Sequence, residues 1–375
     1  MVSQNEFLSG PNDAYHFTDV PIDDTELTRV GPGTPAGEYF RRFWLPVALS
    51  DELRELPVRL RILGEDLVIF RDLSGQIGLL ELHCSHRGAS LEFGQVELRG
   101  IRCCYHGWHF DVDGKILEIP SEQDRVATRE HFFHGAYPTL EHNGLIFAYM
   151  GDPANRPKFP LLDTDGIMPA YGDEWVLAQV QHIRHCNWLQ VRENAMDPAH
   201  FYFLHSMTGN NWFSKDFSYH AEWDFLETPS GMVAIDTRRM GDHAWVLVTD
   251  YIPPNLQVSP ALEGSAGARG PSSRIPWLTW WTVPLDDVNS MHIGYWWARA
   301  DEILQPDGGI TRTSLRPYAE RQRLPGDDDA QVSQRPIAIH QLEHLGSSDR
   351  GVIMLRNIVR RGIRNSGGIA SNYIA

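Results

Sequence analysis

Two short segments decide the fold of the first half of this chain: Cys84-Ser85-His86-Arg87-Gly88-Ala89-Ser90-Leu91 and Cys103-Cys104-Tyr105-His106-Gly107-Trp108. Their cysteines and histidines form the pattern C-x-H, sixteen intervening residues, C-x-x-H. Two ligand pairs on separate loops can close over one [2Fe-2S] cluster, with thiolates on one iron and imidazoles on the other. The pattern therefore predicts a redox cluster held by Cys84, His86, Cys103 and His106.

The flanking residues narrow the kind of cluster site. A Cys2His2 set also suits zinc, so a zinc site is the alternative that the spacing leaves open. The two quoted segments resemble the Rieske domain of the ring-hydroxylating oxygenases. Respiratory Rieske proteins carry an extra cysteine in each loop, and the matching positions here are Ala89 and Tyr105. The resemblance is therefore to the oxygenase type, which lacks that disulfide.

Length and charge limit the possible partners. A chain of 375 residues with 42% hydrophobic content can form two packed cores, so we expect two domains. The balance of 33 basic and 49 acidic side chains gives a net charge of -16, which repels nucleic acid and anionic lipid. The segment Met1 to Gly10 has no signal-peptide pattern, and no stretch approaches the ~20 apolar residues of a membrane span. We expect a cytoplasmic protein with no nucleic-acid or membrane partner.

Strand patterns dominate the first half. Residues 58–70, 78–83, 100–104, 109–112 and 145–150 read as strands, and Asp113-Gly114 is a hairpin turn signal. The breaker-rich run 151–157 indicates a boundary. We predict an N-terminal segment at 1–42 that packs on the catalytic domain, an all-β Rieske domain at 43–155, and a catalytic domain at 156–375.

The second half has a mixed pattern. Residues 185–205 are helix-like, 277–283 and 291–300 are aromatic strands with five tryptophans between them, and 345–361 reads as a terminal helix. Tryptophans in such strands are best explained as core residues. The predicted fold class is α+β: an all-β Rieske domain plus an antiparallel sheet with helices on one side, a helix-grip-like arrangement.

A second cluster of ligand-type residues lies in the helix-like segment, which contains Asp197-Pro198-Ala199-His200 and His205. Two histidines and a carboxylate on one face of Fe(II) leave positions open for oxygen and substrate. In a regular helix, however, residues five apart point about 140° away from each other. The histidines can share an ion only if the helix is kinked or widened, and Pro198 and π-type bulges are both known causes.

This segment is similar to the mononuclear iron motif of the Rieske oxygenases, including Asn187-Trp188 before the helix. The resemblance implies that His200 and His205 are iron ligands and that Asp197 is a bridge between the two metal centres. Spacing cannot select the third ligand, and the candidates are Asp301, Glu302, Asp327, Asp328, Asp329, Glu343 and Asp349. The segment 346–351 resembles the Ser-Asp pair of phthalate- and carbazole-type oxygenases, so Asp349 is the predicted ligand, with a helix-start carboxylate as the alternative.

The resemblance extends to residues 29–35, which look like the leader of the phthalate-dioxygenase group. It implies a terminal oxygenase subunit that uses O2 and hydroxylates or O-demethylates a small aromatic substrate, with or without a carboxylate. Electrons would come from an NAD(P)H-dependent reductase, directly or through a ferredoxin, and the subunits would form a homotrimer, alone or stacked as a hexamer. Arg192, Arg238 and Arg239 are candidates for a substrate carboxylate. The alternatives are a Rieske-type electron carrier with a structural second domain, or a zinc-stapled binding module.

Overall fold

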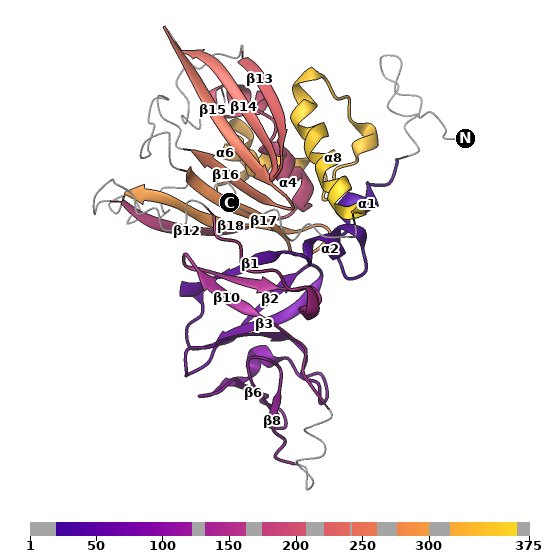
Figure 1. Cartoon of the computed structure of the whole chain (residues 1–375), viewed down its shortest axis with the longest axis vertical. Helices are drawn as coiled ribbons and strands as arrows, with labels where there is room; N and C mark the ends of the chain where they lie inside the picture. Colours follow the sequence, from indigo (N-terminus) through magenta and orange to yellow (C-terminus); the bar gives the residue numbers. More distant parts are fainter. Residues whose placement is uncertain are drawn as a thin grey trace.

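The computed structural model describes residues 20–121, 132–162, 175–207, 221–240, 242–260, 276–299 and 316–365. Three small antiparallel sheets lie in one half of the molecule and one large sheet in the other (Figure 1). None of the helices in these ranges is long and apolar enough to cross a membrane. The structure confirms the α+β class with an all-β first half.

In the described residues, the first half contains eleven short strands. The sheet orders are β1-β11-β10, β2-β3-β4-β9 and β5-β6-β7-β8. The strands are β1 Trp44–Leu49, β2 Val58–Ile62, β3 Glu65–Arg71, β4 Ile77–Glu81, β5 Gln95–Val96, β6 Ile101–Arg102, β7 His109–Phe110, β8 Ile116–Glu118, β9 Ala136–Tyr137, β10 Thr139–His142 and β11 Leu145–Tyr149.

Two hairpin turns test the sequence prediction. Residues 58–70, expected as one strand, form the two paired strands β2 and β3. Leu63 and Gly64 between them both have positive φ (50° and 79°), which is the turn geometry that suits a two-residue hairpin. The turn at Asp113-Gly114 is confirmed, because it joins the paired strands β7 and β8. A Cβ on Gly114 would lie 2.1 Å from the His134 carbonyl oxygen, so this position requires glycine.

The second half contains a seven-stranded antiparallel sheet in the order β12-β18-β17-β16-β15-β14-β13. Both predicted aromatic strands are confirmed as β17 and β18. The strands are β12 Trp175–Arg184, β13 Ala221–Thr228, β14 Gly231–Met240, β15 His243–Ile252, β16 Leu256–Pro260, β17 Pro276–Pro284 and β18 Ser290–Arg299.

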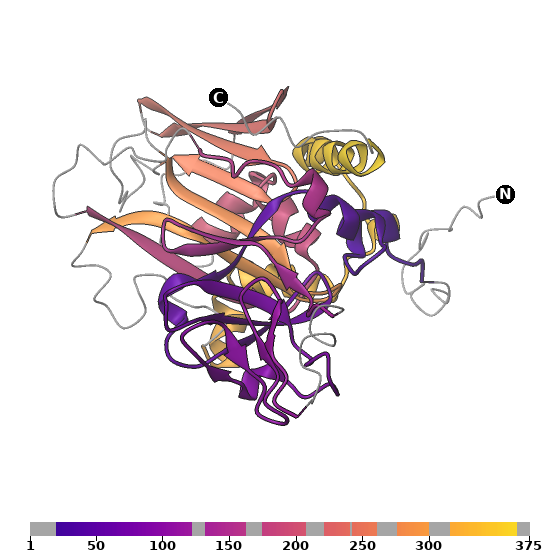
Figure 2. The same ribbon diagram turned by 60° about the horizontal axis from the view of Figure 1, so that its bottom comes forward.

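Helices cover one face of this sheet, as the sequence predicts. They are α1 Thr25–Thr28, α2 Pro35–Phe40, α4 Trp188–Asn194, α6 Tyr318–Arg323, α7 Asp327–Ser333 and α8 Arg350–Arg364. Figure 2 shows α8 beside α2 at one end of the sheet. The N-terminal helices join this layer, since Trp188 Nε1 donates to the Leu27 carbonyl (3.1 Å) and Arg360 forms ion pairs with Asp24 and Glu26.

The opposite face of the large sheet packs on the first half of the chain. Strand residues alternate between faces, so Trp281, Val283 and Ile293 point to one side and join a core that includes Phe147 of β11. The rings of Phe147 and Trp281 meet edge to face, with centroids 5.4 Å apart. Strands β17 and β18 are therefore covered on both faces.

Replacement of Phe147 tests this packing between the two halves. We expect Phe147→Ala to lower the free energy of unfolding by about 3–5 kcal/mol, because it removes a ring from a closed core. Leu56→Ala is the control, since Leu56 is 76% exposed, and should change stability by less than about 0.5 kcal/mol. Urea unfolding followed by tryptophan fluorescence measures both. Equal effects of the two changes would show that the contact is not a stabilising one.

Candidate metal centres

The two cluster loops have the same backbone construction. In the first loop, the Cys84 N–H donates to the carbonyl five residues on, at Ala89 (2.9 Å), and the Cys84 carbonyl accepts the N–H of Gly88 (2.8 Å). In the second loop, the Cys103 N–H donates to Trp108 (2.8 Å) and the Cys103 carbonyl accepts from Gly107 (3.1 Å). Both glycines have positive φ, 75° and 74°, which favours glycine. Two equivalent turns thus present one cysteine each.

The side chains of these loops converge on one point. Cys84 and Cys103 are buried and not in a disulfide, and burial together with the neighbouring Cys103 thiol raises the pKa of Cys84 to about 12. The imidazole rings of His86 and His106 lie 4.5 Å apart, and His86 stacks on Trp108 at 4.9 Å. Within the described part of the chain, the buried Nδ1 of His86 has no hydrogen-bond partner.

A thiol with the raised pKa of Cys84 stays protonated unless a metal replaces the proton. An imidazole nitrogen that lacks a partner is likewise ready to bind a metal. The four residues predicted from the sequence therefore fit a [2Fe-2S] cluster, with two thiolates and two imidazoles.

Arg102 supports the second cluster loop, and the sequence analysis did not identify it. Its guanidinium donates to the Gly107 carbonyl (2.8 Å) and forms ion pairs with Glu97 and with Glu118 (2.9 Å). A cation anchored by two carboxylates thereby fixes the turn that carries Cys103 and His106. Only the tertiary structure brings these groups together, so no local pattern could have revealed the role.

The helix that carries the second pair of histidines is widened. Residues Phe201–Met207 form a π-helix, in which i→i+5 bonding places residues five apart nearly above one another. The rings of His200 and His205 therefore lie close, with centroids 5.2 Å apart. The prediction that this segment must depart from a regular helix is confirmed. The single helix expected over 185–205 is wrong, since α4 spans only Trp188–Asn194 and the π-helix begins separately at Phe201.

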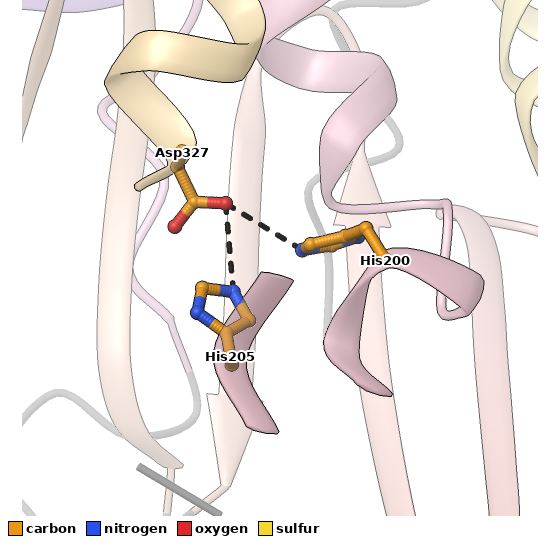
Figure 3. A group of neighbouring side chains, drawn as sticks. All are labelled: His200, His205 and Asp327. Atoms are coloured by element: carbon orange, nitrogen blue, oxygen red, sulfur yellow. Dashed lines mark ion pairs between the residues drawn. The ribbon is translucent and has the colours of Figure 1, made fainter. Parts of the chain in front are cut away.

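Asp327 completes a group of three possible ligands (Figure 3). Its Oδ1 lies 3.6 Å from His200 Nε2 and 3.5 Å from His205 Nε2. Helix α7 supplies the carboxylate, the π-helical segment supplies His205, and His200 directly precedes that segment. Burial raises the pKa of Asp327, but the hydrogen bond and charge of His205, with His200 and Arg184, lower it well below its usual range. This is the two-histidine, one-carboxylate set of non-heme iron sites.

The predicted ligand Asp349 is not part of this group, and the arrangement of the side chains favours Asp327 in its place. Asp349 accepts the backbone N–H of Gly346 (2.6 Å) three residues before it, at the start of α8. Asp329 does the same for Gly326 (3.0 Å) at the start of α7. Both segments have the pattern G-x-x-D, and Asp349 corresponds in position to Asp329, the capping residue. The alternative of a helix-start carboxylate therefore describes Asp349.

The three consecutive aspartates of α7 have three different partners. Asp327 faces the histidines and accepts from Asn194 Nδ2 (3.3 Å). Asp328 forms an ion pair with the buried Arg184, and Asp329 caps the helix and pairs with Arg321. The two neighbours thus hold the first turn of α7 in place, and Asp327 is left to face the metal position.

Asp197 lies beside His200, where the sequence expects a bridging residue. The backbone carbonyl of Asp197 accepts a hydrogen bond from His200 Nδ1, which leaves Nε2 unprotonated and directed at Asp327. The Asp197 carboxylate caps the helix through the Ala199 N–H (3.0 Å) and lies 3.8 Å from His200 Nδ1. Burial raises the pKa of Asp197, and the charge of His200 opposes that rise. Its role as a bridge to a second metal centre stays a prediction.

The three arginines considered for substrate binding differ in burial. Arg239 is exposed, whereas Arg238 is fully buried and donates to Asp236 (2.8 Å) and to the Pro198 carbonyl (2.6 Å). Arg238 thus ties β14 to the turn before His200 and has a structural explanation. Arg192 is also fully buried, and its partners are different in kind, as described below.

A second acidic group outside this centre does not need a metal. Glu193, His340 and Glu343 lie close enough to share an ion. However, the guanidinium of Arg356 occupies the group, since it donates to Glu193 (2.5 Å) and twice to Glu343 (2.6 and 2.8 Å). An arginine paired with two carboxylates offsets part of their charge and uses their hydrogen-bonding capacity, so we interpret this group as a structural ion-pair network.

Comparisons with known proteins agree with these two centres. The sequence profile of the Rieske [2Fe-2S] domain matches residues 43–131. The chain is 42% identical to the tert-butanol monooxygenase / tert-amyl alcohol desaturase oxygenase subunit of Aquincola tertiaricarbonis, over 90% of this chain and 76% of that protein. It is 37% identical to the phenoxybenzoate dioxygenase subunit alpha of Ectopseudomonas oleovorans, over 91% and 84%. The phthalate 4,5-dioxygenase oxygenase subunit of Pseudomonas putida is 31% identical, over 90% and 85%.

Solved structures share the fold. Dicamba monooxygenase bound to dicamba superposes with a TM-score of 0.60 at 18% identity, over 86% of this chain and 97% of that one. The oxygenase and ferredoxin complex of carbazole 1,9a-dioxygenase gives a TM-score of 0.58 at 19% identity, over 87% and 91%. The chain belongs to the Rieske oxygenases: it is an oxygenase subunit of this family, with a [2Fe-2S] cluster and a mononuclear non-heme iron as its cofactors.

Adjacent cysteines provide a matched test of the cluster ligands. We expect Cys103→Ser to abolish the visible absorbance of the cluster, because it removes a thiolate ligand, and Cys104→Ser to retain it, because Cys104 is exposed beside the loop. Absorbance spectra and iron content of the purified variants measure this. Loss of the cluster in both variants, or in neither, would contradict the assignment.

Asp327 and Asp349 can be compared in the same way. We expect Asp327→Asn to lower bound iron from about three to about two atoms per chain, with the cluster spectrum unchanged, because an amide oxygen is a much weaker ligand than a carboxylate. Asp349→Asn should keep all of its iron and lose about 0.5–1 kcal/mol of stability through the weakened cap. If instead Asp349→Asn loses the third iron, the original prediction from the sequence would be restored.

Proposed function

We propose that this oxygenase subunit hydroxylates or O-demethylates a small aromatic substrate at the centre formed by His200, His205 and Asp327. The observation that carries the proposal is that these three side chains meet although they come from two distant segments. When bound, the iron activates O2 with electrons received from the cluster. Two of the three relatives named above are named for phthalate and phenoxybenzoate, which supports an aromatic substrate, while the third is named for tert-butanol and tert-amyl alcohol.

The protein groups around the centre have defined tasks. The Asp197 carbonyl fixes the tautomer of His200, so that its Nε2 lone pair faces the ligand group. Asn194 and the lowered pKa of Asp327 keep that carboxylate ionised and oriented. The remaining positions around a facial set of three ligands stay open to oxygen and substrate. The alternative of an electron carrier with a structural second domain leaves this convergence unexplained.

We infer that electrons enter through the cluster loops. His86 and His106 are only half-buried, and the neighbouring Tyr105 is 59% exposed, so a partner can approach the imidazole side of the site. A reductase that oxidises NAD(P)H, directly or through a ferredoxin, is the partner that this role requires. The cytoplasmic location expected from the sequence would give it access to such a reductase.

Transfer from the cluster to the iron is proposed to occur between copies of the chain. Within one chain, the β5–β8 sheet beside the cluster loops lies at the far end from α4 and the large sheet (Figure 1). A ring of three head-to-tail subunits would instead bring His106 of one copy to Asp197 of the next. Asp197 contacts His200, so it is suited to the bridging role. Such trimers, alone or stacked as hexamers, are part of the proposal.

Co-expression of two inactive variants tests this arrangement. Cys84→Ser lacks the cluster and Asp327→Asn lacks the iron, so each should be inactive alone. After random assembly, about three quarters of the trimers contain both variants, and each of these has one complete cluster–iron pair where the wild type has three. This predicts about a quarter of the wild-type rate of oxygen uptake. A reductase and substrate that support the wild type are used for all samples. An inactive mixture of correctly assembled trimers would show that transfer occurs within one chain.

A further inference from the structure

One face of the large sheet carries a row of polar side chains toward α4. Strand pairing places Gln257 beside Trp280, and Thr282 and His182 on either side of His292. Because paired residues point to the same face, these five side chains share a face, opposite to the core residues Trp281 and Ile293. The prediction that the tryptophans are core residues therefore holds for Trp281 but not for Trp280.

Arg192 of α4 lies against this row as a buried cation. It is only 1% exposed, and it donates to two neutral acceptors, the Asn255 carbonyl (3.1 Å) and Gln257 Oε1 (2.5 Å). Among the described residues no carboxylate pairs with Arg192, and its buried Nε has no hydrogen-bond partner. Burial lowers the pKa of Arg192 to about 10. The buried Arg356, by contrast, has two carboxylate partners, so the lack of an anion distinguishes Arg192.

His292 adds further unused hydrogen-bonding capacity. It is 6% exposed, and in the described ranges neither of its ring nitrogens has a hydrogen-bond partner. Its ring lies 4.0 Å from that of Trp280, whose indole N–H is buried and likewise unpartnered. Burial and the charges of His182, Arg184 and Arg192 lower the pKa of His292, so it is a neutral imidazole with one N–H donor. Buried polar groups are normally satisfied, so several unpaired donors together are suited to bind an anionic group.

The row adjoins the iron centre. Arg192 lies on α4, and the last residue of that helix, Asn194, donates to Asp327. Arg184, on the same sheet face as His182, acts electrostatically on both Asp327 and His292. A small molecule bound at the iron could therefore extend along this face and reach the unpaired donors.

We propose that Arg192, His292 and Trp280 form a subsite for an anionic oxygen group of the substrate, a carboxylate or a sulfonate on an aromatic ring. This inference rests on the proposed function and names the residues that select its substrates. The anion would supply the charge that Arg192 lacks and would accept the N–H groups of all three side chains. The residues thus act in binding and orientation, and the ligand atoms at the iron remain His200, His205 and Asp327.

Calorimetric titration of the holoenzyme with matched ligands tests the subsite. The first series of probes is benzoate, benzenesulfonate and the neutral benzamide. The second series is 3-phenoxybenzoate, 3-phenoxybenzenesulfonate and 3-phenoxybenzamide. We expect the wild type to bind at least one anion about tenfold or more tightly than its amide, since a buried charge pair discriminates by at least this factor. The ratio between carboxylate and sulfonate identifies which group fits. Equal affinity for anion and amide in both series, or no binding of any anion, would overturn the inference.

The variants separate this subsite from the oxygenase function. Arg192→Gln should bring the ratio of amide to anion Kd close to one, while Arg239→Gln, the exposed control arginine, should leave it unchanged. Trp280→Phe keeps the ring and removes the N–H, so it should lower the ratio several-fold even if Arg192→Gln fails to fold. Each variant should retain its iron content and cluster spectrum. The subsite alone is overturned if the wild type has its full iron content and takes up oxygen with a neutral substrate but shows no preference for anions. The proposed function is overturned if the wild type lacks the third iron and takes up no oxygen with any substrate.

Discussion

The widened helix between Phe201 and Met207 is the constraint on which the iron centre depends. A five-residue spacing turns two side chains about 140° apart in an α-helix, whereas i→i+5 bonding aligns them. A π-helix is rare because its hydrogen bonds are less favourable, so its neighbours must hold it. Here Arg238 donates to the Pro198 carbonyl just before the segment, and the Asp197 carboxylate caps its first turn. The side chain of His205 can then lie beside that of His200 without any distortion of the sheet.

The alternation of side chains along β17 and β18 organises the rest of the molecule. Trp281, Val283 and Ile293 seal the large sheet against Phe147 and the strands of the first half. Their immediate neighbours Trp280 and His292 lie on the opposite face of the sheet, toward α4. A shift of one residue in register would exchange these two sets and expose the core to the reaction site. The same pairing therefore fixes the interface between the halves and the lining of the catalytic side.

The sequence predicted those features whose residues lie close together in the chain. Both cluster loops are short turns, so their four ligands and two glycines could be identified directly, and the need for a widened helix followed from the spacing of His200 and His205 alone. The third ligand could not be found in this way, because Gly326 to Asp329 and Gly346 to Asp349 share the capping pattern G-x-x-D. Only packing shows which of the two helices faces the histidines. The partners of Arg102 and Arg192 likewise come from distant strands.

The charges inside the catalytic half explain why an anion suits it. Asp328 neutralises Arg184, and Glu193 and Glu343 together more than compensate Arg356. Near the iron centre, the carboxylates of Asp327 and Asp197 lie close to the histidines, whereas Arg192 has no carboxylate partner among the described residues. Arg192 is therefore the cation of this group whose charge no neighbouring carboxylate offsets, although the whole chain carries a charge of -16. Because interactions inside a protein are weakly screened, the buried Arg192 attracts an anionic group more strongly than the acidic surface opposes it.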